Sequence, residues 1–243
     1  MDESEPIWRY EEYFTPPQMP QRHPVVLEAE EYVNARHLEL HPFFDIAVKS
    51  PEALRIWVTQ EIVMTNPFSQ IVLKAASLFK NVHLRAMLNA VALGEHGHVK
   101  NGIAKASHPW LLHQLRESLS IPTSDVYPYP ETIGFLQGLS DDCKNPIEAV
   151  AAIGVGNERL IIPEYDAIKR CFAACCPDAD YRPFLDANIN EDVVHSDLLY
   201  DVASCLIMGG ASPKTYIDAA VRGVDRRYQY FDRLYDRAKA FRP

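Results

Sequence analysis

Apolar residues recur at intervals of three and four along most of the chain from about residue 24 onward, which is the period of amphipathic helices. This pattern predicts a first helix over 25–48 and a second from Pro51 to about Phe79, because Ser50 is a good N-cap and proline suits the first helical position. Short alternating runs flanked by turn dipeptides are essentially missing, so strands are not expected. Further helices are expected over about 81–98, 106–119, 130–140, 145–176, 180–208 and 212–240.

Breaks in this pattern set the domain organisation. Pro67 and Pro163 should bend the helices that contain them, and Gly209–Gly210 should end the helix before it. No stretch rich in Gly or Ser divides the chain. We therefore predict one compact all-α bundle of about seven to eight helices over 23–243, preceded by an extended, proline-rich arm over 1–22.

Composition excludes several classes of function. The chain has 243 residues and a formal charge of −9, and its one basic stretch, Arg222–Arg242, is interleaved with aspartates and is interpreted as a solvated helix face. Nucleic-acid and membrane partners are therefore not expected, since there is also no apolar run of about 18 residues. Five cysteines without a CxxC pair, and an acidic N-terminus without an apolar segment, predict free thiols in the cytoplasm.

Acidic residues lie in stretches whose helical faces should be apolar. Glu61, Glu95 and Glu158 are each flanked by apolar residues, and Asp192 and His195 share one such stretch. A buried carboxylate costs several kcal/mol unless it is paired or bound to a metal. These positions are therefore candidates for metal ligands.

The spacing of these residues sharpens the prediction. Glu95-x-x-His98 and Asp192-x-x-His195 are both acid-x-x-His pairs, and an i,i+3 pair projects from one face of a helix. Each pair follows a lone glutamate, Glu61 or Glu158, by 34 residues. This is the ligand inventory of a di-iron or di-manganese carboxylate site in a helical bundle.

Neighbouring residues compete for some of these roles. His96 and His108 are rivals of His98, and Glu191 is a rival of Asp192. Asn188 lies one turn before Asp192 on the same helical face, where a neutral amide is a weak ligand and a hydrogen-bonding group. Trp57, Phe68 and Tyr165 are candidates for a pocket wall or for ordinary core residues.

Motifs over about residues 35–210 resemble the heme-oxygenase-like diiron oxidases, relatives of thiaminase-II, pyrroloquinoline-quinone synthase and the chlamydial death-domain-associated protein. The resemblance rests on HPFF, W-x-x-Q-E, EHG…HPWLL, AVAAIGVGNE…IP and FLDANINEDVVHS. It implies that Glu158, Asp192 and His195 are ligands, and that the middle-helix histidine is His98 or His108. The first histidine of the family's final motif is Asn188 here, which implies that one iron is held by fewer ligands.

The resemblance also implies an activity. The expected protein is a non-heme oxidoreductase with two Fe(II), one of them weakly bound, and O2 as co-substrate. Its substrate would be a small amino-acid-like or carboxylate molecule of specialised metabolism, undergoing C–C cleavage, desaturation, N-oxygenation or nitrile formation. Glu158 and Asn188 would lie at the catalytic centre, and a homodimer is one candidate assembly.

Two other hypotheses fit the same helical class. One is a metal-free thiaminase-II-like hydrolase or cofactorless oxidase, in which Cys143 or Cys205 would be the nucleophile. The other is a non-catalytic metal-binding protein. The first gives the paired acid-x-x-His pattern no role, and the second needs no substrate pocket.

Overall fold

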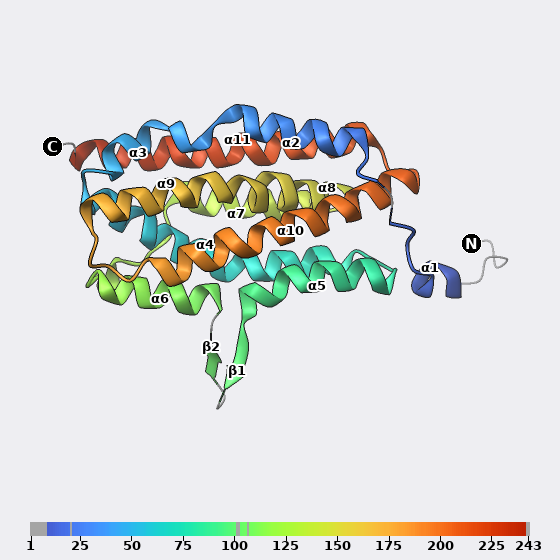
Figure 1. The fold of residues 1–243 in the computed structure, drawn as a ribbon, viewed down its shortest axis with the longest axis horizontal. Helices are drawn as coiled ribbons and strands as arrows, with labels where there is room; N and C mark the ends of the chain where they lie inside the picture. Colours follow the sequence, from blue (N-terminus) through green and yellow to red (C-terminus); the bar gives the residue numbers. More distant parts are fainter. Residues whose placement is uncertain (1–8, 20, 101–102, 106, 242–243) are drawn as a thin grey trace.

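The computed structural model describes residues 9–19, 21–100, 103–105 and 107–241. They form an α-helical bundle with one small β-hairpin (Figure 1), so the predicted all-α class is confirmed. The α-helices are α1 (Tyr10–Phe14), α2 (Pro24–Arg36), α3 (Pro42–Ala47), α4 (Pro51–Ser77), α5 (Val82–His96), α6 (His108–Ser118), α7 (Pro130–Asp142), α8 (Pro146–Ile153), α9 (Leu160–Cys175), α10 (Arg182–Met208) and α11 (Pro213–Ala238). Shorter segments are the 3-10 turns η1 (Leu38–Leu40), η2 (Thr123–Asp125) and η4 (Lys239–Phe241), and the π-helical segment η3 (Gly154–Arg159).

The long helices run roughly along one axis. In the view of Figure 1, α2, α3 and α11 lie along the top, α7 to α10 through the middle, and α4 to α6 along the bottom. Contacts join α11 to α2, α3 and α8, and α4 to α5 and α6. No helix in the described ranges has both the length and the apolar character needed to cross a membrane.

Local signals account for most helix boundaries. Ser50 accepts a hydrogen bond from the Ala53 amide, and Pro51 follows it at the first helical position, as predicted. Asn145 caps α8 in the same way by accepting from the Glu148 amide. The helix before Gly209 ends at Met208, also as predicted.

The predicted helix over 25–48 is wrong in its continuity. It is divided into α2, η1 and α3 because His37 adopts a left-handed conformation with φ 52°, and Pro42 keeps His41 extended. The predicted helix over 145–176 is present as one helical path over 146–175, with the π-helical segment η3 in its middle. The division of the first helix adds short segments to the helices expected.

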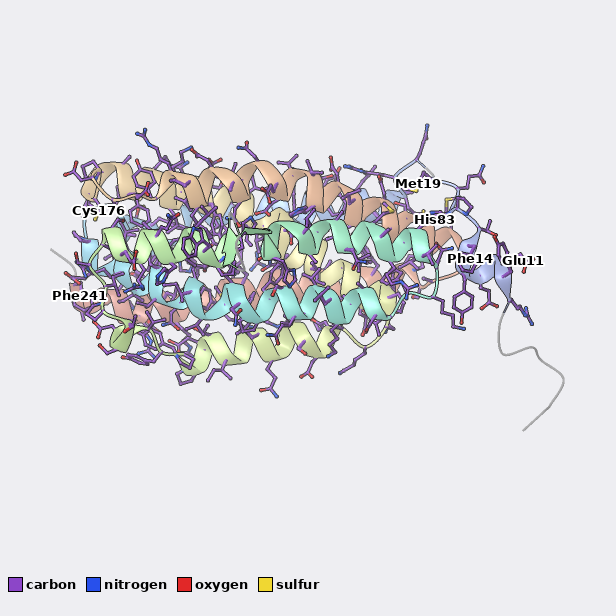
Figure 2. The ribbon with its side chains drawn as sticks, turned by 90° about the horizontal axis from the view of Figure 1, so that it is seen from below. Glu11, Phe14, Met19, His83, Cys176 and Phe241 are labelled. Carbon is purple, nitrogen blue, oxygen red and sulfur yellow. The ribbon has the colours of Figure 1, made fainter. Side chains whose placement is uncertain are left out.

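The N-terminal segment is less extended than predicted, because residues 10–14 form α1. The segment after α1 is attached to the end of the bundle, where the Asn81 side chain donates to the Thr15 carbonyl at 2.9 Å. His83 Nε2 lies 3.2 Å from the Phe14 carbonyl oxygen. Figure 2 shows Phe14, Met19 and His83 together at this end, opposite Cys176 and Phe241.

A β-hairpin interrupts the chain between α5 and α6, where no strand was expected. Strands β1 (His98–Lys100) and β2 (Ile103–Lys105) pair antiparallel and project from the bundle (Figure 1). The helix ends early because Gly97 has φ 61° and ψ −159°, a conformation that favours glycine. His98 therefore lies in a strand and not on the helical face that carries Glu95.

The helical path over 146–175 changes to π-helix at η3 and then continues through Pro163 as α9. At η3 the backbone lies very close to α11, because a Cβ placed on Gly156 would be 2.7 Å from the Gly223 Cα. Only glycine at both positions allows this approach. The contact fixes the segment that carries Glu158.

Helix α11 presents one buried stripe to the bundle, at the three- and four-residue spacing of a core-facing helix. Arg227 lies within this stripe and is 1 % exposed. The interpretation of Arg222–Arg242 as a solvated face is therefore wrong at Arg227. It holds on the outer side, where Arg233 and Lys239 pair with Asp236.

Candidate metal centre

Three of the predicted ligands lie together in the bundle interior. One ligand atom each from Glu158, Asp192 and His195 lies within 4.8 Å of the others. His195 Nδ1 is 3.3 Å from Glu158 Oε2 and 3.5 Å from Asp192 Oδ1. All three side chains are buried, with Glu158 only 1 % exposed.

Two features of the backbone bring this cluster together. Asp192 and His195 share a face of α10 because residues at i and i+3 are neighbours on a helix. Glu158 lies in η3, and π-helical segments within α-helices are frequent at functional sites because the extra residue redirects the side chains that follow. The spacing argument thus predicted the α10 pair, but not the π-helical segment.

Glu95 and His108 form a second acid–histidine pair. His108 Nδ1 is 2.9 Å from Glu95 Oε1, and both side chains are buried. Glu95 comes from the last turn of α5, whereas His108 is the first residue of α6, where Ser107 caps the helix. Of the rival histidines, His108 contacts Glu95, while the side chain of His98 lies outside the described residues.

Glu191 lies beside His108, whereas Asp192 lies beside His195. Glu191 Oε2 lies 3.3 Å from His108 Nε2 and its side chain is 45 % exposed, whereas Asp192 is buried beside His195. Asn188 is buried one turn earlier, and its amide donates to the Phe184 carbonyl at 2.7 Å. His96 turns back toward its own helix, with Nδ1 2.7 Å from the Ala92 carbonyl oxygen.

Several ligand atoms in this centre lack a hydrogen-bonding partner. Within the described part of the chain, none is found for Oε2 of Glu95, Oε1 of Glu158 or Oδ2 of Asp192. A buried polar atom without a partner costs about 1–3 kcal/mol, and more if it is charged. Three such carboxylate oxygens, on side chains that line one cavity, are a donor set suited to metal ions.

The electrostatics of the cluster also indicate a need for positive charge. Burial raises the pKa of Asp192 well above its usual range, and the neighbouring Glu158 raises it further. Burial lowers the pKa of His195, but the hydrogen bonds and charges of Asp192 and Glu158 outweigh this effect and raise it to about 10. Without an ion, the cluster thus draws in protons to balance its carboxylates.

A cavity of about 30 Å³ joins the acidic side chains of the centre, which is room for about two water molecules or metal ions. Glu95, Glu158, Asn188 and Asp192 line one part of it. Phe68 and Tyr165, two of the candidate wall residues, also line it, whereas the third candidate, Trp57, is fully buried elsewhere in the core.

Glu61 lines the same cavity but has different partners. The Tyr165 hydroxyl donates to Glu61 Oε2 at 3.0 Å, and Arg227 Nη2 lies 3.5 Å from Glu61 Oε1. Arg227 makes shorter bonds with Glu164, at 2.7 Å from both Nε and Nη2. The Trp57 indole also donates to Glu164, at 3.3 Å.

This buried network is the part of the cavity that sequence reasoning missed. A signal was present, because Arg227 falls in register with the apolar positions Val224, Tyr230 and Phe231 of α11. A charged residue at such a position needs a buried partner. The sequence does not identify that partner as Glu164, which is distant along the chain.

The all-helical fold of this chain is similar to the folds of two solved structures. A CADD-like protein of unknown function from Nostoc punctiforme is 15% identical, with a TM-score of 0.70 over 88% of this chain and 96% of that one. A TenA homologue from Pseudomonas syringae is 12% identical, with a TM-score of 0.69 over 90% of this chain and 100% of that one. No family model and no curated protein matches the sequence. At these identities, the likeness establishes the fold.

Proposed function

We propose that the protein is a non-heme diiron enzyme that uses O2 to oxidise a small substrate. The observation that carries this proposal is the set of three unpartnered carboxylate oxygens, on Glu95, Glu158 and Asp192, around one cavity. A buried imidazole lies against two of these carboxylates, His108 against Glu95 and His195 against Glu158. Carboxylate and imidazole donors in a helical bundle are the combination that binds iron or manganese pairs. The fold shared with the CADD-like protein and the TenA homologue is compatible with this function.

The proposed ligands form two groups. Glu158, Asp192 and His195 would hold one ion, while Glu95 and His108 would hold the other. Asn188 supplies no strong donor, which supports the expectation that one ion is held by fewer ligands. Glu61 is omitted from the set because Arg227 and Tyr165 already contact it.

When bound, the iron would supply O2 activation and one-electron chemistry. The chain's own residues position and protect the site. Tyr165 and Asn188 line the cavity with polar groups, while Phe68 and Phe135 exclude bulk water from it. The backbone at η3 holds Glu158 rigidly against α11, which fixes its orientation toward Asp192 and His195.

The thiol-based alternative has less support. Burial raises the pKa of Cys143 to about 11, so this thiol is not ionised at neutral pH, and it does not line the cavity. Cys205 lies near the N-terminal segment, where its sulfur contacts the Gln18 carbonyl oxygen at 3.7 Å. All five cysteines are free, as predicted.

The test is an anaerobic Fe(II) titration followed by measurement of O2 consumption. Wild-type protein should bind two iron ions per chain, one more weakly than the other, and consume O2 with a suitable substrate. Glu158→Ala and His195→Ala should abolish both properties. His113→Ala removes an imidazole that is 47 % exposed and serves as the matched control. Full iron binding and O2 consumption by Glu158→Ala would overturn the proposal.

A further inference from the structure

The guanidinium of Arg227 makes short hydrogen bonds along one edge and long, weak contacts along the other. Glu164 accepts from Nε and Nη2 at 2.7 Å, which uses one edge of the guanidinium in a bidentate pair. Among the residues that the structure describes, the remaining N–H groups reach Glu61 at 3.5 Å and the Met64 sulfur at 3.9 Å. A thioether is a weak acceptor, so this second edge is incompletely satisfied although the side chain is almost fully buried.

This second edge belongs to the cavity of the metal centre. Arg227, Glu61 and Met64 line that cavity together with Glu158 and Asp192. Aromatic rings fix the guanidinium in place, since its carbon lies 5.3 Å from the ring centre of Phe135 and 5.4 Å from that of Tyr230. The group is therefore preorganised and does not need to be ordered when a ligand binds.

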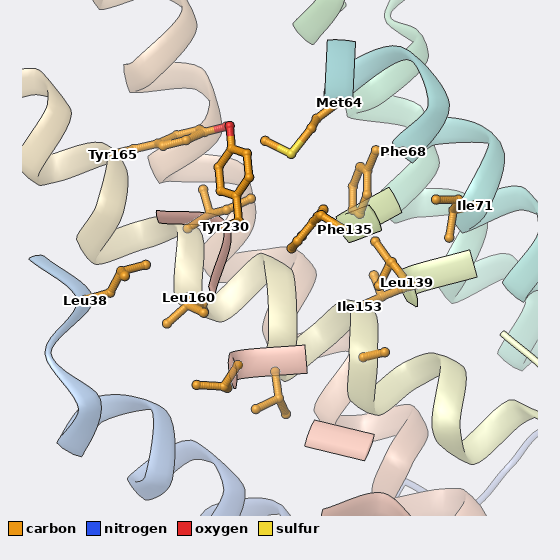
Figure 3. Packing of buried hydrophobic residues seen from close by; sticks show 14 of the residues in the cluster. Leu38, Met64, Phe68, Ile71, Phe135, Leu139, Ile153, Leu160, Tyr165 and Tyr230 are labelled. Atoms are coloured by element: carbon orange, nitrogen blue, oxygen red, sulfur yellow. The ribbon is translucent and has the colours of Figure 1, made fainter. Parts of the chain in front are cut away.

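Hydroxyl groups add to the polarity of this end. Figure 3 shows Tyr165 and Tyr230 on one side of the Met64 sulfur and Phe68 on the other. The Tyr230 hydroxyl is buried and has no hydrogen-bonding partner among the described residues. Tyr165 bonds to Glu61 and lines the cavity.

We propose that Arg227 anchors a carboxylate group of the substrate, with the Tyr165 and Tyr230 hydroxyls beside it. A carboxylate matches the planar fork of a guanidinium and would replace the weak contacts to Met64 and Glu61. This inference deepens the proposed function and rests on it: the anchored molecule would have its carboxylate at Arg227 and its reacting end toward Glu158 and Asp192.

The charge of the network is compatible with this ligand. Burial raises the pKa of Glu61 to about 8, although Arg227 opposes the shift, so Glu61 is largely neutral at pH 7. A neutral Glu61 does not repel a carboxylate placed at the second edge of Arg227. The small cavity restricts the ligand to a short molecule, and the flexible Met64 side chain can move to admit it.

Three small probes test the anchor by calorimetry on the metal-free protein: propionate, the isosteric propionamide, and the cation n-propylamine. Propionate should bind, whereas the amide and the amine should bind about tenfold more weakly or not at all. Arg227→Lys, which keeps the charge but loses the fork, should weaken propionate binding by about tenfold. Equal binding of propionate and propionamide by the wild-type protein would overturn the proposal.

A double variant addresses the risk that loss of Arg227 alone prevents folding. Arg227→Met combined with Glu164→Gln removes both charges of the pair, so that no unpaired charge stays buried at that pair. It should fold, lose propionate binding and keep both iron ions; retained propionate binding in this folded variant would overturn the anchor. Tyr230→Phe should fold and weaken propionate binding by less than Arg227→Lys does.

The two proposals fail in different ways. If the wild-type protein binds two iron ions but shows no preference for propionate, the anchor is wrong and the metal centre stands. If propionate binding depends on Arg227 but no iron binds, the proposed function is wrong, and Arg227 is an anion site without a metal centre beside it.

Discussion

His108 Nδ1 lies 2.9 Å from Glu95 Oε1, although a β-hairpin separates the two residues along the chain. The contact joins the end of α5 to the start of α6, and it replaces the i,i+3 pair that the sequence predicts for Glu95. The hairpin brings the start of α6 back to the end of α5, so that His108 lies beside Glu95 where the sequence predicted His98.

The first prediction follows from this contact. His108→Ala should remove one of the two iron ions, because its buried imidazole lies against Glu95, the other proposed ligand of that ion. His98→Ala should leave the iron content at two per chain, since the backbone of residue 98 lies in the hairpin. Metal analysis after anaerobic loading distinguishes them, and equal iron loss in both variants would contradict the assignment.

The helices themselves were predictable because their signals are local. Ser50 before Pro51 and the glycines at 209–210 mark helix ends within a few residues, and the structure follows them. The break at His37 was not predictable in the same way, because a left-handed histidine has no strong residue signature.

The candidate site was predictable in part. An acid in an apolar stretch shows that a carboxylate is buried, and the i,i+3 rule placed Asp192 beside His195 correctly. The same reasoning treated Glu61 and Glu95 alike, although α9 and α11 supply Glu61 with Tyr165 and Arg227. Those partners come from distant parts of the chain, and spacing along one helix carries no information about them.

The second prediction concerns the residue that departs from the family motif. Asn188 lies one helical turn before Asp192 and lines the cavity, so an imidazole there should reach the same ions. Asn188→His should tighten binding of the weaker iron by about tenfold or more, because an imidazole replaces a neutral amide as ligand. Competition with a chelator measures the two affinities separately.

A control for this variant is Asn188→Leu, which removes the amide without adding a donor. It should not tighten either affinity. If Asn188→His and Asn188→Leu bind iron equally, residue 188 does not face the metal ions. The proposal that Asn188 leaves one iron with fewer ligands is then wrong.

The third prediction tests how the backbone holds Glu158. Gly156→Ala would place a methyl group 2.7 Å from the Gly223 Cα, so η3 and α11 must separate. Overpacking of this kind costs about 1–3 kcal/mol of the free energy of unfolding. Because Glu158 is two residues away, the variant should also bind iron less tightly.

Gly134→Ala is the matched control, since a Cβ at this helical glycine meets no atom within 4 Å. It should be neutral or stabilise the protein by about 1 kcal/mol, because alanine favours the helix. Urea unfolding measures both variants. A Gly156→Ala protein as stable as wild type would show that the close approach of η3 and α11 is not required.

The fourth prediction uses the raised pKa of Glu61. The pKa of Glu61 is raised from 4.5 to about 8, chiefly by burial. Glu164 also raises this pKa, whereas Arg227 and Tyr165 lower it. Below the unfolded value, both states are protonated and the full contribution to stability is present. As the pH rises toward 8, the unfolded chain releases the proton while the folded chain retains it, so the free energy of unfolding falls across this window.

Glu61→Gln removes this titration and should flatten the fall in stability between about pH 5 and 8, by an amount on the order of a few kcal/mol. Glu131→Gln is a contrasting control, because its pairing with Arg237 lowers the pKa of Glu131 and the sign reverses. The Glu131 carboxylate contributes stability above its unfolded pKa, and that stability is lost as the pH falls. Urea unfolding at a series of pH values separates the two variants. A Glu61→Gln profile parallel to that of the wild type would show that Glu61 is already ionised beside Arg227 in the folded protein.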